Sequence, residues 1–177
     1  MGKIKAVVLI FALIIVLTGC QPKKEGLPSF SDGAFACEAS WVCEGKTVRA
    51  EISAGEIRSD GLPRDLSIAF SEPRAMSGIT VCRKDGKISA FIDGLTWEGE
   101  YLRGWLGTEA LFETDGDIIG SFPETLNGDT VRHLTLKRTD GENTEMYLSS
   151  AGGLPVKLCG KVNGKYTEVT ILRFEKK

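Results

Sequence analysis

The sequence has little of what enzyme chemistry requires. His133 is the only histidine among 177 residues, and no serine or cysteine nucleophile stands beside it. His133 also alternates out of phase with Leu134 and Leu136, so we expect it to face solvent on a strand. The short stretch 115–117, Asp-Gly-Asp, is only a fragment of a calcium-binding loop. We therefore expect a protein without catalytic activity and without a cofactor.

Basic blocks and metal-ligand spacings are also missing. No CxxC motif or paired Cys/His spacing occurs, which argues against a metal site. The whole chain carries 22 basic and 24 acidic residues. Removal of an N-terminal leader containing Lys3 and Lys5 would leave 20 against 24, a net charge of −4. A mildly acidic chain without a basic patch is not expected to bind nucleic acid.

No apolar run is long enough for an ordinary transmembrane helix. The longest, residues 6–17, has twelve consecutive apolar residues after a short basic start. As a helix it would span roughly 18 Å, well short of the ~30 Å hydrocarbon core. A basic start followed by a short apolar core is typical of an export signal, with a retained signal anchor as the alternative.

The residues that follow the apolar run resemble the lipobox of bacterial lipoproteins. Leu17-Thr18-Gly19-Cys20 has the required order of leucine, small residue, glycine and cysteine, whereas an A-x-A secretory cleavage site is absent. The resemblance implies cleavage between Gly19 and Cys20 and a covalent diacylglycerol on Cys20. Acyl chains on Cys20 would hold the mature protein in membrane lipid, at the extracytoplasmic face of the cell membrane.

These signals divide the chain into three parts. Residues 1–19 are predicted to be a lipoprotein signal peptide, and residues 20–33 an acylated N-terminus followed by a flexible tether rich in proline and glycine. Residues 34–177 are predicted to be one folded domain. The domain has four cysteines, Cys37, Cys43, Cys82 and Cys159, for which buried free thiols and one or two disulfides both remain open.

Alternating apolar residues and tight turns dominate the domain. Residues 34–43 place Phe35, Cys37, Ala39, Trp41 and Cys43 on one face. Asp-Gly at 85–86 and Asn-Gly at 163–164 each favour a two-residue hairpin turn. Strands are predicted at 34–43, 46–53, 65–71, 78–83, 87–92, 131–138, 144–149, 155–161 and 165–174.

Residues 98–112 have a different pattern. Tyr101, Leu102, Trp105 and Leu106 recur near helical spacing, although Gly104 and Gly107 each disfavour a helix by about 1 kcal/mol. An amphipathic helix covering a sheet would account for the aromatic residues, and a loop is the alternative. The fold class is therefore α+β: a curved antiparallel β-sheet covered by one or a few helices.

Two stretches resemble the LolA-like lipoprotein-carrier superfamily. Residues 65–97, DLSIAFSEPRAMSGITVCRKDGKISAFIDGLTW, and the C-terminal YLSSAGGLPVKLCGKVNGKYTEVTILRF carry its order of strands and turns. The resemblance implies a half-barrel closed by helices over an apolar cavity. In carrier members of the superfamily this cavity holds the acyl chains of a lipid or lipoprotein.

The resemblance also indicates which side chains would line such a cavity. The candidates are apolar or aromatic residues expected on the inner face of the sheet or on the covering helix. They are Leu66, Ile68, Phe70, Ile79, Val81, Trp97, Tyr101, Trp105, Leu134 and Leu136. The alternative is a closed core in which the same residues pack against the helix.

Two functional hypotheses follow from the sequence. The first is a membrane-anchored, non-catalytic module that binds lipid or another apolar ligand in a half-barrel cavity. The second is a structural or regulatory lipoprotein of the cell envelope that binds a protein partner and holds no lipid. A cavity distinguishes the first hypothesis, and an exposed apolar patch without a cavity the second.

Overall fold

The computed structural model describes residues 26–60 and 62–177. The predicted signal peptide, the cleavage site at Gly19 and Cys20, and the lipidation site Cys20 itself lie outside the described residues. In the described part of the chain, no helix combines the length and the apolar character needed to cross a bilayer.

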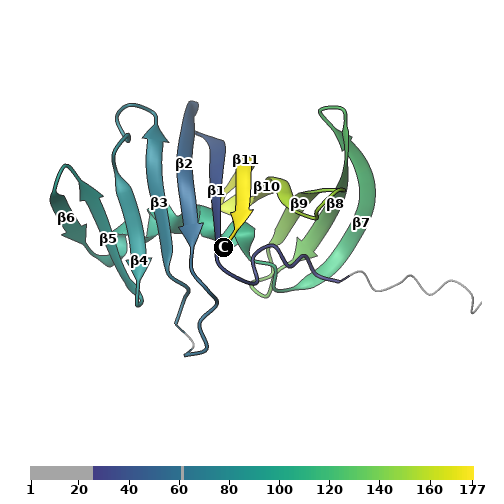
Figure 1. The fold of residues 1–177 in the computed structure, drawn as a ribbon, viewed down its shortest axis with the longest axis horizontal. Helices are drawn as coiled ribbons and strands as arrows, with labels where there is room; N and C mark the ends of the chain where they lie inside the picture. Colours follow the sequence, from purple (N-terminus) through teal and green to yellow (C-terminus); the bar gives the residue numbers. More distant parts are fainter. Residues whose placement is uncertain (1–25, 61) are drawn as a thin grey trace, which may run out of the picture.

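The described domain is a large open antiparallel sheet of 11 strands that curves strongly (Figure 1). The strand order is β6-β5-β4-β3-β2-β1-β11-β10-β9-β8-β7. The strands are β1 (Phe35–Cys43), β2 (Lys46–Ala54), β3 (Leu66–Glu72), β4 (Thr80–Lys84), β5 (Lys87–Ile92), β6 (Leu95–Glu98), β7 (Asp117–Leu126), β8 (Asp129–Lys137), β9 (Asn143–Ser149), β10 (Pro155–Val162) and β11 (Lys165–Lys176). The predicted antiparallel sheet is confirmed.

Two meanders make up the sheet, and they meet at its centre. Strands β1 to β6 follow one another toward one edge, and β11 back to β7 toward the other. The first and last strands pair antiparallel, with Phe35 opposite Lys176 and Trp41 opposite Val169. The first and last strands of the described chain therefore lie side by side at the centre of the sheet.

Two-residue turns close five of the hairpins. In each turn both central residues have positive φ, the conformation that matches the twist of the flanking strands. Asp85 and Gly86 have φ of 49° and 76°, and Asn163 and Gly164 have 51° and 77°. The other three turns are Glu44-Gly45, Asp93-Gly94 and Asn127-Gly128. The hairpin turns predicted at Asp-Gly and Asn-Gly are confirmed.

The helical segment predicted at 98–112 is a 3-10 helix, η1 (Glu100–Phe112), rather than an α-helix. It lies across one face of the sheet and contacts β4, β5 and β10 (Figure 1). Leu102, Leu106, Leu111 and Phe112 are buried on its inner side. A Cβ at Gly160 of β10 would lie 2.8 Å from Leu111 Cδ2, so a glycine there lets η1 approach the sheet closely.

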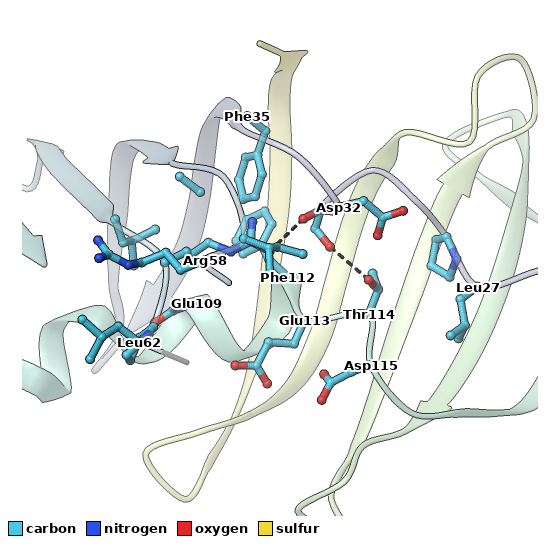
Figure 2. A pocket seen from close by; sticks show the side chains of 17 residues that line it. Leu27, Asp32, Phe35, Arg58, Leu62, Glu109, Phe112, Glu113, Thr114 and Asp115 are labelled. Carbon is cyan, nitrogen blue, oxygen red and sulfur yellow. Dashed lines mark hydrogen bonds between the residues drawn. The ribbon is translucent and has the colours of Figure 1, made fainter. Parts of the chain in front are cut away.

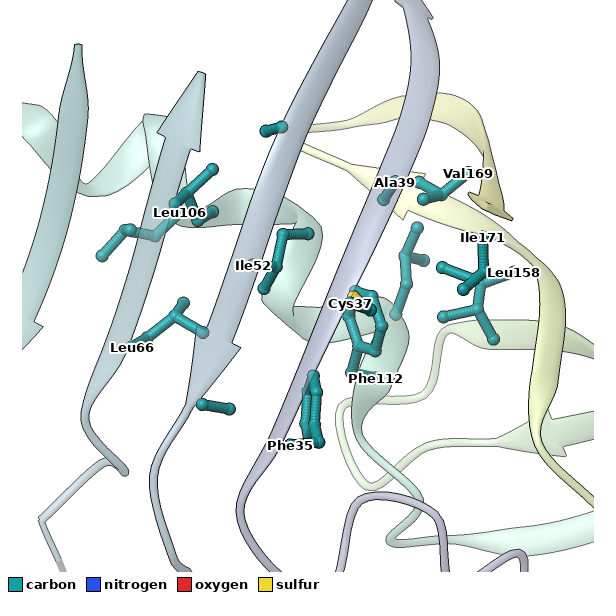
Figure 3. Packing of buried hydrophobic residues seen from close by; sticks show 14 of the residues in the cluster. Phe35, Cys37, Ala39, Ile52, Leu66, Leu106, Phe112, Leu158, Val169 and Ile171 are labelled. Atoms are coloured by element: carbon teal, nitrogen blue, oxygen red, sulfur yellow. The ribbon is translucent and has the colours of Figure 1, made fainter. Parts of the chain in front are cut away.

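The core fills the space between the inner face of the sheet and η1. Cross-strand pairing places Ile52, Ile68 and Val81 in one row over β2, β3 and β4. Leu106 and Phe112 of η1 belong to the same cluster (Figure 3). Burial of each such aliphatic side chain contributes about 1.5–3 kcal/mol to the stability of the folded state, so this cluster holds η1 against the sheet.

Two strands were not predicted, β6 and β7. β7 contains Gly120 and Pro123, which weaken the pattern of a strand. Proline is tolerated there because β7 is at an edge of the sheet, and the register shifts between Ile118 and Gly120. β6 has only four residues, all exposed, and therefore has no alternation of buried and exposed positions.

The four described cysteines are free thiols. Cys37 and Cys159 are buried, Cys82 is half-buried, and Cys43 is exposed. The apolar face predicted for residues 34–43 is thus wrong at Cys43, because the end of β1 extends beyond the core. Burial, reinforced by the negative charge of Glu51, raises the pKa of the Cys37 thiol to about 12.

The positive φ at Gly164 predicts that an alanine substitution there destabilises the fold more than one at Gly152. Gly164 has a left-handed backbone, and a Cβ there would meet no atom within 4 Å, so Gly164→Ala tests conformation alone. We expect its free energy of unfolding in urea to fall by about 1–2 kcal/mol. Gly152 lacks positive φ and has room for a methyl group, so the control Gly152→Ala should change stability by less than about 0.5 kcal/mol. Equal effects would contradict the turn assignment.

Candidate functional site

A pocket of about 620 Å³ opens where β1 and β3 begin and β2 ends (Figure 2). Three segments form its walls: residues 27–32 before β1, residues 57–58 and 62–64 of the loop between β2 and β3, and residues 109–115 at the end of η1. Phe35, Ala54 and Leu66 at the strand ends also line it. The volume lies within the range of small-molecule binding sites.

The N-terminal wall is held against the last strand. Phe30 is buried and packs edge-on against Phe174 of β11, with ring centroids 5.8 Å apart. Lys176 Nζ donates a hydrogen bond to the Ser29 carbonyl at 3.0 Å. Ser31 is buried, and its hydroxyl lies 3.1 Å from that of Thr114. This arrangement differs from the solvated tether predicted through residue 33, since Phe30 and Ser31 belong to the folded structure.

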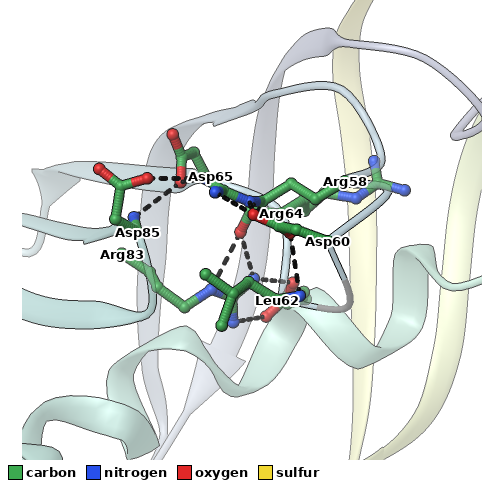
Figure 4. A network of polar contacts seen from close by, with 8 residues as sticks. Arg58, Asp60, Leu62, Arg64, Asp65, Arg83 and Asp85 are labelled. Atoms are coloured by element: carbon green, nitrogen blue, oxygen red, sulfur yellow. Dashed lines mark hydrogen bonds and ion pairs between the residues drawn. The ribbon is translucent and has the colours of Figure 1, made fainter.

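The loop wall is fixed by arginines that bind backbone carbonyls (Figure 4). Arg64 Nη2 donates to the Ser31 carbonyl at 2.7 Å, which joins the loop to the N-terminal wall. Arg83 of β4 donates from Nη2 to the Arg64 carbonyl at 2.7 Å. The same guanidinium pairs with Glu109 of η1, with Nη1 2.6 Å from Oε2. The three walls are therefore connected through Arg64 and Arg83.

Arg58 holds the outer end of the loop. Its guanidinium pairs with Asp60 and, 2.8 Å away, with Asp85 in the β4–β5 turn, and Asp65 lies 3.5 Å away. The hydrogen bond from Arg58, together with one from the Leu62 backbone, lowers the pKa of Asp60 to about 2. The carboxylates in turn raise the pKa of Arg58, so this exposed network stays ionised at neutral pH.

The third wall carries carboxylates at its exposed end. Glu113 and Asp115 follow η1 and line the pocket, with Arg138 of the β8–β9 connection nearby. Arg138 is itself occupied: it donates to the Ala110 carbonyl at 2.8 Å and pairs with Asp140. Desolvation raises the pKa of the Glu113 carboxyl, and the charge of Asp115 adds to this effect against the attraction of Arg138.

Most predicted cavity residues lie in the packed core. Ile68, Val81, Leu134 and Leu136 are fully buried there, Phe70 is buried, and Ile79 is half-buried against the same cluster. Leu66 is the one predicted residue that lines the described pocket at the end of the sheet.

The three predicted lid aromatics lie away from this pocket. Trp97 on β6, and Tyr101 and Trp105 on η1, are among the exposed large side chains, with Tyr101 70% exposed. Trp105 still contacts the core edge-on through Phe70, at a centroid distance of 5.6 Å. The structure therefore does not bring these aromatics together with Leu66.

The prediction that His133 faces solvent is wrong. His133 points away from the core, as its phase on β8 requires, but it is 9% exposed. Its ring stacks on Tyr147 of β9 at 4.2 Å and contacts Phe122 of β7 at 4.6 Å. Nδ1 lies 2.8 Å from a carboxylate oxygen of Glu124. Neighbouring strands cover the ring, an effect that alternation within one strand cannot reveal.

The pocket offers apolar surface together with charged groups. Its lining includes no histidine and no cysteine. Among the described residues, no cluster of three or more His, Cys, Asp or Glu side chains is arranged to hold a metal ion. Such a cavity can bind an apolar group and orient a charged one.

Sequence reasoning missed this pocket because its walls lie outside the regular strands. The available signal was weak: Leu27, Ile57 and Leu62 are apolar residues in segments otherwise rich in proline, glycine and charge. Their convergence depends on contacts with backbone carbonyls, and such contacts leave no periodic pattern.

The raised pKa of Glu113 predicts a pH-dependent stability difference. The folded state binds the Glu113 proton more tightly, so its stabilising contribution is complete below the ordinary pKa of 4.5 and is lost as pH rises through the raised pKa. Glu113→Gln stays neutral at both pH values. The difference in unfolding free energy between this variant and the wild type, measured in urea, should therefore favour the variant more at about pH 7 than at about pH 4. Glu98→Gln, at an exposed position, measures the effect of losing a surface charge. A constant or reversed difference would contradict the assignment.

Comparisons with known proteins concern the fold. No protein-family model matches the sequence, and no curated protein matches it significantly. An uncharacterized conserved protein from Thermus thermophilus matches with a TM-score of 0.51 and 11% identity, over 85% of this chain and 83% of that chain. LolA superfamily protein NE2245 from Nitrosomonas europaea has a TM-score of 0.45 and 10% identity, with 84% and 88% covered. The Pseudomonas aeruginosa MucA/MucB complex has a TM-score of 0.44 and 17% identity, with 84% and 54% covered. At 11% identity, the Thermus thermophilus match shows a similar fold.

Proposed function

We propose that this chain is a non-catalytic binding module, anchored at the extracytoplasmic face of the cell membrane, that holds lipid or another apolar ligand in the pocket between the three walls. The observation that carries the proposal is the pocket itself, a cavity of about 620 Å³ with mainly apolar side chains at its strand end. Leu66 is the one residue shared by this pocket and by the half-barrel cavity predicted from the sequence. The pocket differs from that prediction in its position, because it lies at the ends of the strands.

Exposed apolar side chains around the pocket support a ligand rather than a closed core. Leu27, Ile57 and Leu62 line the pocket and remain exposed to solvent. Phe35 and Phe112 lie deeper and stack on each other at 5.3 Å. A ligand that covers the exposed side chains removes apolar surface from water at about 25 cal/mol per Å², which favours apolar ligands.

The position of the pocket also suits a membrane-anchored protein. Leu27 lies seven residues after Cys20, the proposed site of the diacylglycerol. A fully extended chain of that length spans at most about 25 Å. The pocket would therefore stay within reach of the bilayer surface, so that an apolar ligand needs to travel only a short distance through water.

The proposed anchor predicts that acylation and maturation of the chain require Cys20. We expect Cys20→Ala to abolish acylation and to stop cleavage before residue 20, because the thiol carries the lipid. Globomycin, which blocks the lipoprotein signal peptidase, should likewise block maturation of the wild-type chain. Metabolic labelling with a fatty acid and fractionation of membranes would measure this. Unchanged labelling and maturation of the variant would contradict the anchor.

The proposed ligand site predicts that substitutions at two exposed isoleucines affect the binding of an apolar probe differently. Ile57 lines the pocket and is 59% exposed, whereas Ile119 on β7 is 56% exposed and lies outside the pocket lining. Covering an isoleucine contributes up to about 1.5–3 kcal/mol, so Ile57→Asp should weaken binding of an apolar probe about tenfold or more. Ile119→Asp, the matched control, should bind like the wild type.

Native mass spectrometry after lipid extraction, followed by titration with a neutral dodecyl probe, would measure these affinities. A wild-type chain that binds no apolar probe would contradict the proposal, as would equal loss in both variants.

A second candidate function is supported by a different surface. Leu95, Trp97 and Tyr101 are exposed around β6 and the start of η1, and such apolar patches are typical of protein interfaces. A regulatory or structural envelope lipoprotein would use this patch for a protein partner and leave the pocket without lipid. The same titration separates the two candidates, because only the first requires a bound apolar probe.

A further inference from the structure

Arg64 has a buried hydrogen-bond donor that the folded chain does not use. The residue lines the pocket, and its Nη2 atom donates to the carbonyl of Ser31 at 2.7 Å. Its Nη1 atom is buried and has no hydrogen-bond partner in the described part of the chain. A buried charged donor without an acceptor bears the full cost of its desolvation, so a ligand that supplies an acceptor gains binding free energy.

The charged side chains near Arg64 already have partners inside the protein. Arg58 is paired with aspartates of its own loop and of the β4–β5 turn, and Glu109 is paired with Arg83. The guanidinium of Arg64 lies over the ring of Phe35, 5.8 Å from its centroid. Its positive charge is therefore the one in the pocket lining that no carboxylate of residues 26–60 and 62–177 neutralises through an ion pair.

Three carboxylates in the same lining oppose an anion only weakly. Asp32, Glu113 and Asp115 are exposed to solvent. At physiological ionic strength the Debye length is about 8 Å, so salt screens the charges of such exposed groups. A buried guanidinium nitrogen is screened much less, and its attraction for an anion at hydrogen-bond distance therefore outweighs their repulsion.

Exposed apolar side chains lie on the same loop as Arg64. Ile57 is 59% exposed and Leu62 is 43% exposed, and both line the pocket. Leu62 precedes Arg64 by two residues in the loop drawn in Figure 4. Phe35 and Leu66, in contrast, are already buried and offer little further surface. The apolar part of a ligand therefore removes most surface from water where it covers the loop side chains.

We propose that the pocket binds an anionic amphiphile, whose carboxylate or phosphate oxygen accepts hydrogen bonds from Arg64 Nη1 and whose apolar tail covers Ile57 and Leu62. This inference rests on the proposed function and deepens it by naming the charge of the ligand's head group. The unpaired donor carries it, because a hydrogen bond from a guanidinium to an anionic oxygen is about twice as strong as a neutral one. Because Nη1 is buried, binding requires a local movement of the side chains that cover it.

Four probes with the same twelve-carbon tail test the proposal: dodecanoate, dodecyl phosphate, neutral 1-dodecanol and dodecyltrimethylammonium. Each is titrated into the full mature chain at an ionic strength of about 0.15 M, below its aggregation concentration, and binding is measured by native mass spectrometry. We expect at least one of the two anions to bind about tenfold or more tightly than 1-dodecanol, and the cation to bind no more tightly than the alcohol. The anion that binds more tightly identifies the head group as a carboxylate or a phosphate.

Matched arginine variants separate a local effect from net charge. Arg64→Gln removes the charge but keeps a side-chain N–H group for the Ser31 carbonyl. It should reduce the preference for the anion to about twofold or less and leave the affinity for 1-dodecanol unchanged, whereas a collapsed pocket would lose both. Arg74→Gln, at an exposed position outside the pocket lining, removes the same charge and should keep the wild-type preference.

Arg64→Lys keeps the positive charge without the planar guanidinium and should retain part of the preference. If Arg64→Gln does not fold, the wild-type order of the four probes and the partial preference of Arg64→Lys decide the question.

The outcomes distinguish this inference from the proposed function. If 1-dodecanol or the cation binds the wild type as tightly as both anions, or if Arg64→Gln and Arg74→Gln lose the preference equally, the inference is overturned and the apolar pocket stands. If none of the four probes binds, the proposed function itself is overturned.

Discussion

The pairing of β1 with β11 is the constraint on which the rest of the structure depends. Each of the two meanders can form locally, because tight turns connect most of their strands. Only the central pair, formed by the two ends of the folded chain, joins them into one sheet. This pair also places Phe174 and Lys176 against residues 29–30, and so builds the N-terminal wall of the pocket. Fold and site therefore share one long-range contact.

Polar contacts connect the walls of the pocket, in addition to the packing of Phe30 against Phe174. Arg64 and Arg83 donate to backbone carbonyls, and Arg138 does the same at the end of η1. Such charge-assisted hydrogen bonds position loops without filling the space between them. Apolar side chains such as Ile57 and Leu62 are consequently held at a cavity instead of being buried in the core.

The sheet could be predicted from the sequence wherever one strand carries its own signal. Phe35, Cys37 and Ala39 alternate with polar residues, and the alternation and the turns at Asp85-Gly86 and Asn163-Gly164 are local properties. β7 could not be recognised, since the edge position that tolerates Pro123 is a property of the whole sheet. The burial of His133 and the convergence of the pocket walls likewise depend on neighbouring elements, which alternation within a strand does not encode.

The central position of β1 has a mechanical consequence. β1 is hydrogen-bonded along its length to β2 on one side and to β11 on the other. A pulling force applied through the N-terminus, in the direction of β1, would load both ladders in shear, so that many hydrogen bonds share the force at once. An edge strand such as β6 or β7 would instead be peeled away one bond at a time. The central pair of strands should therefore resist tension applied along β1 better than either edge strand resists it.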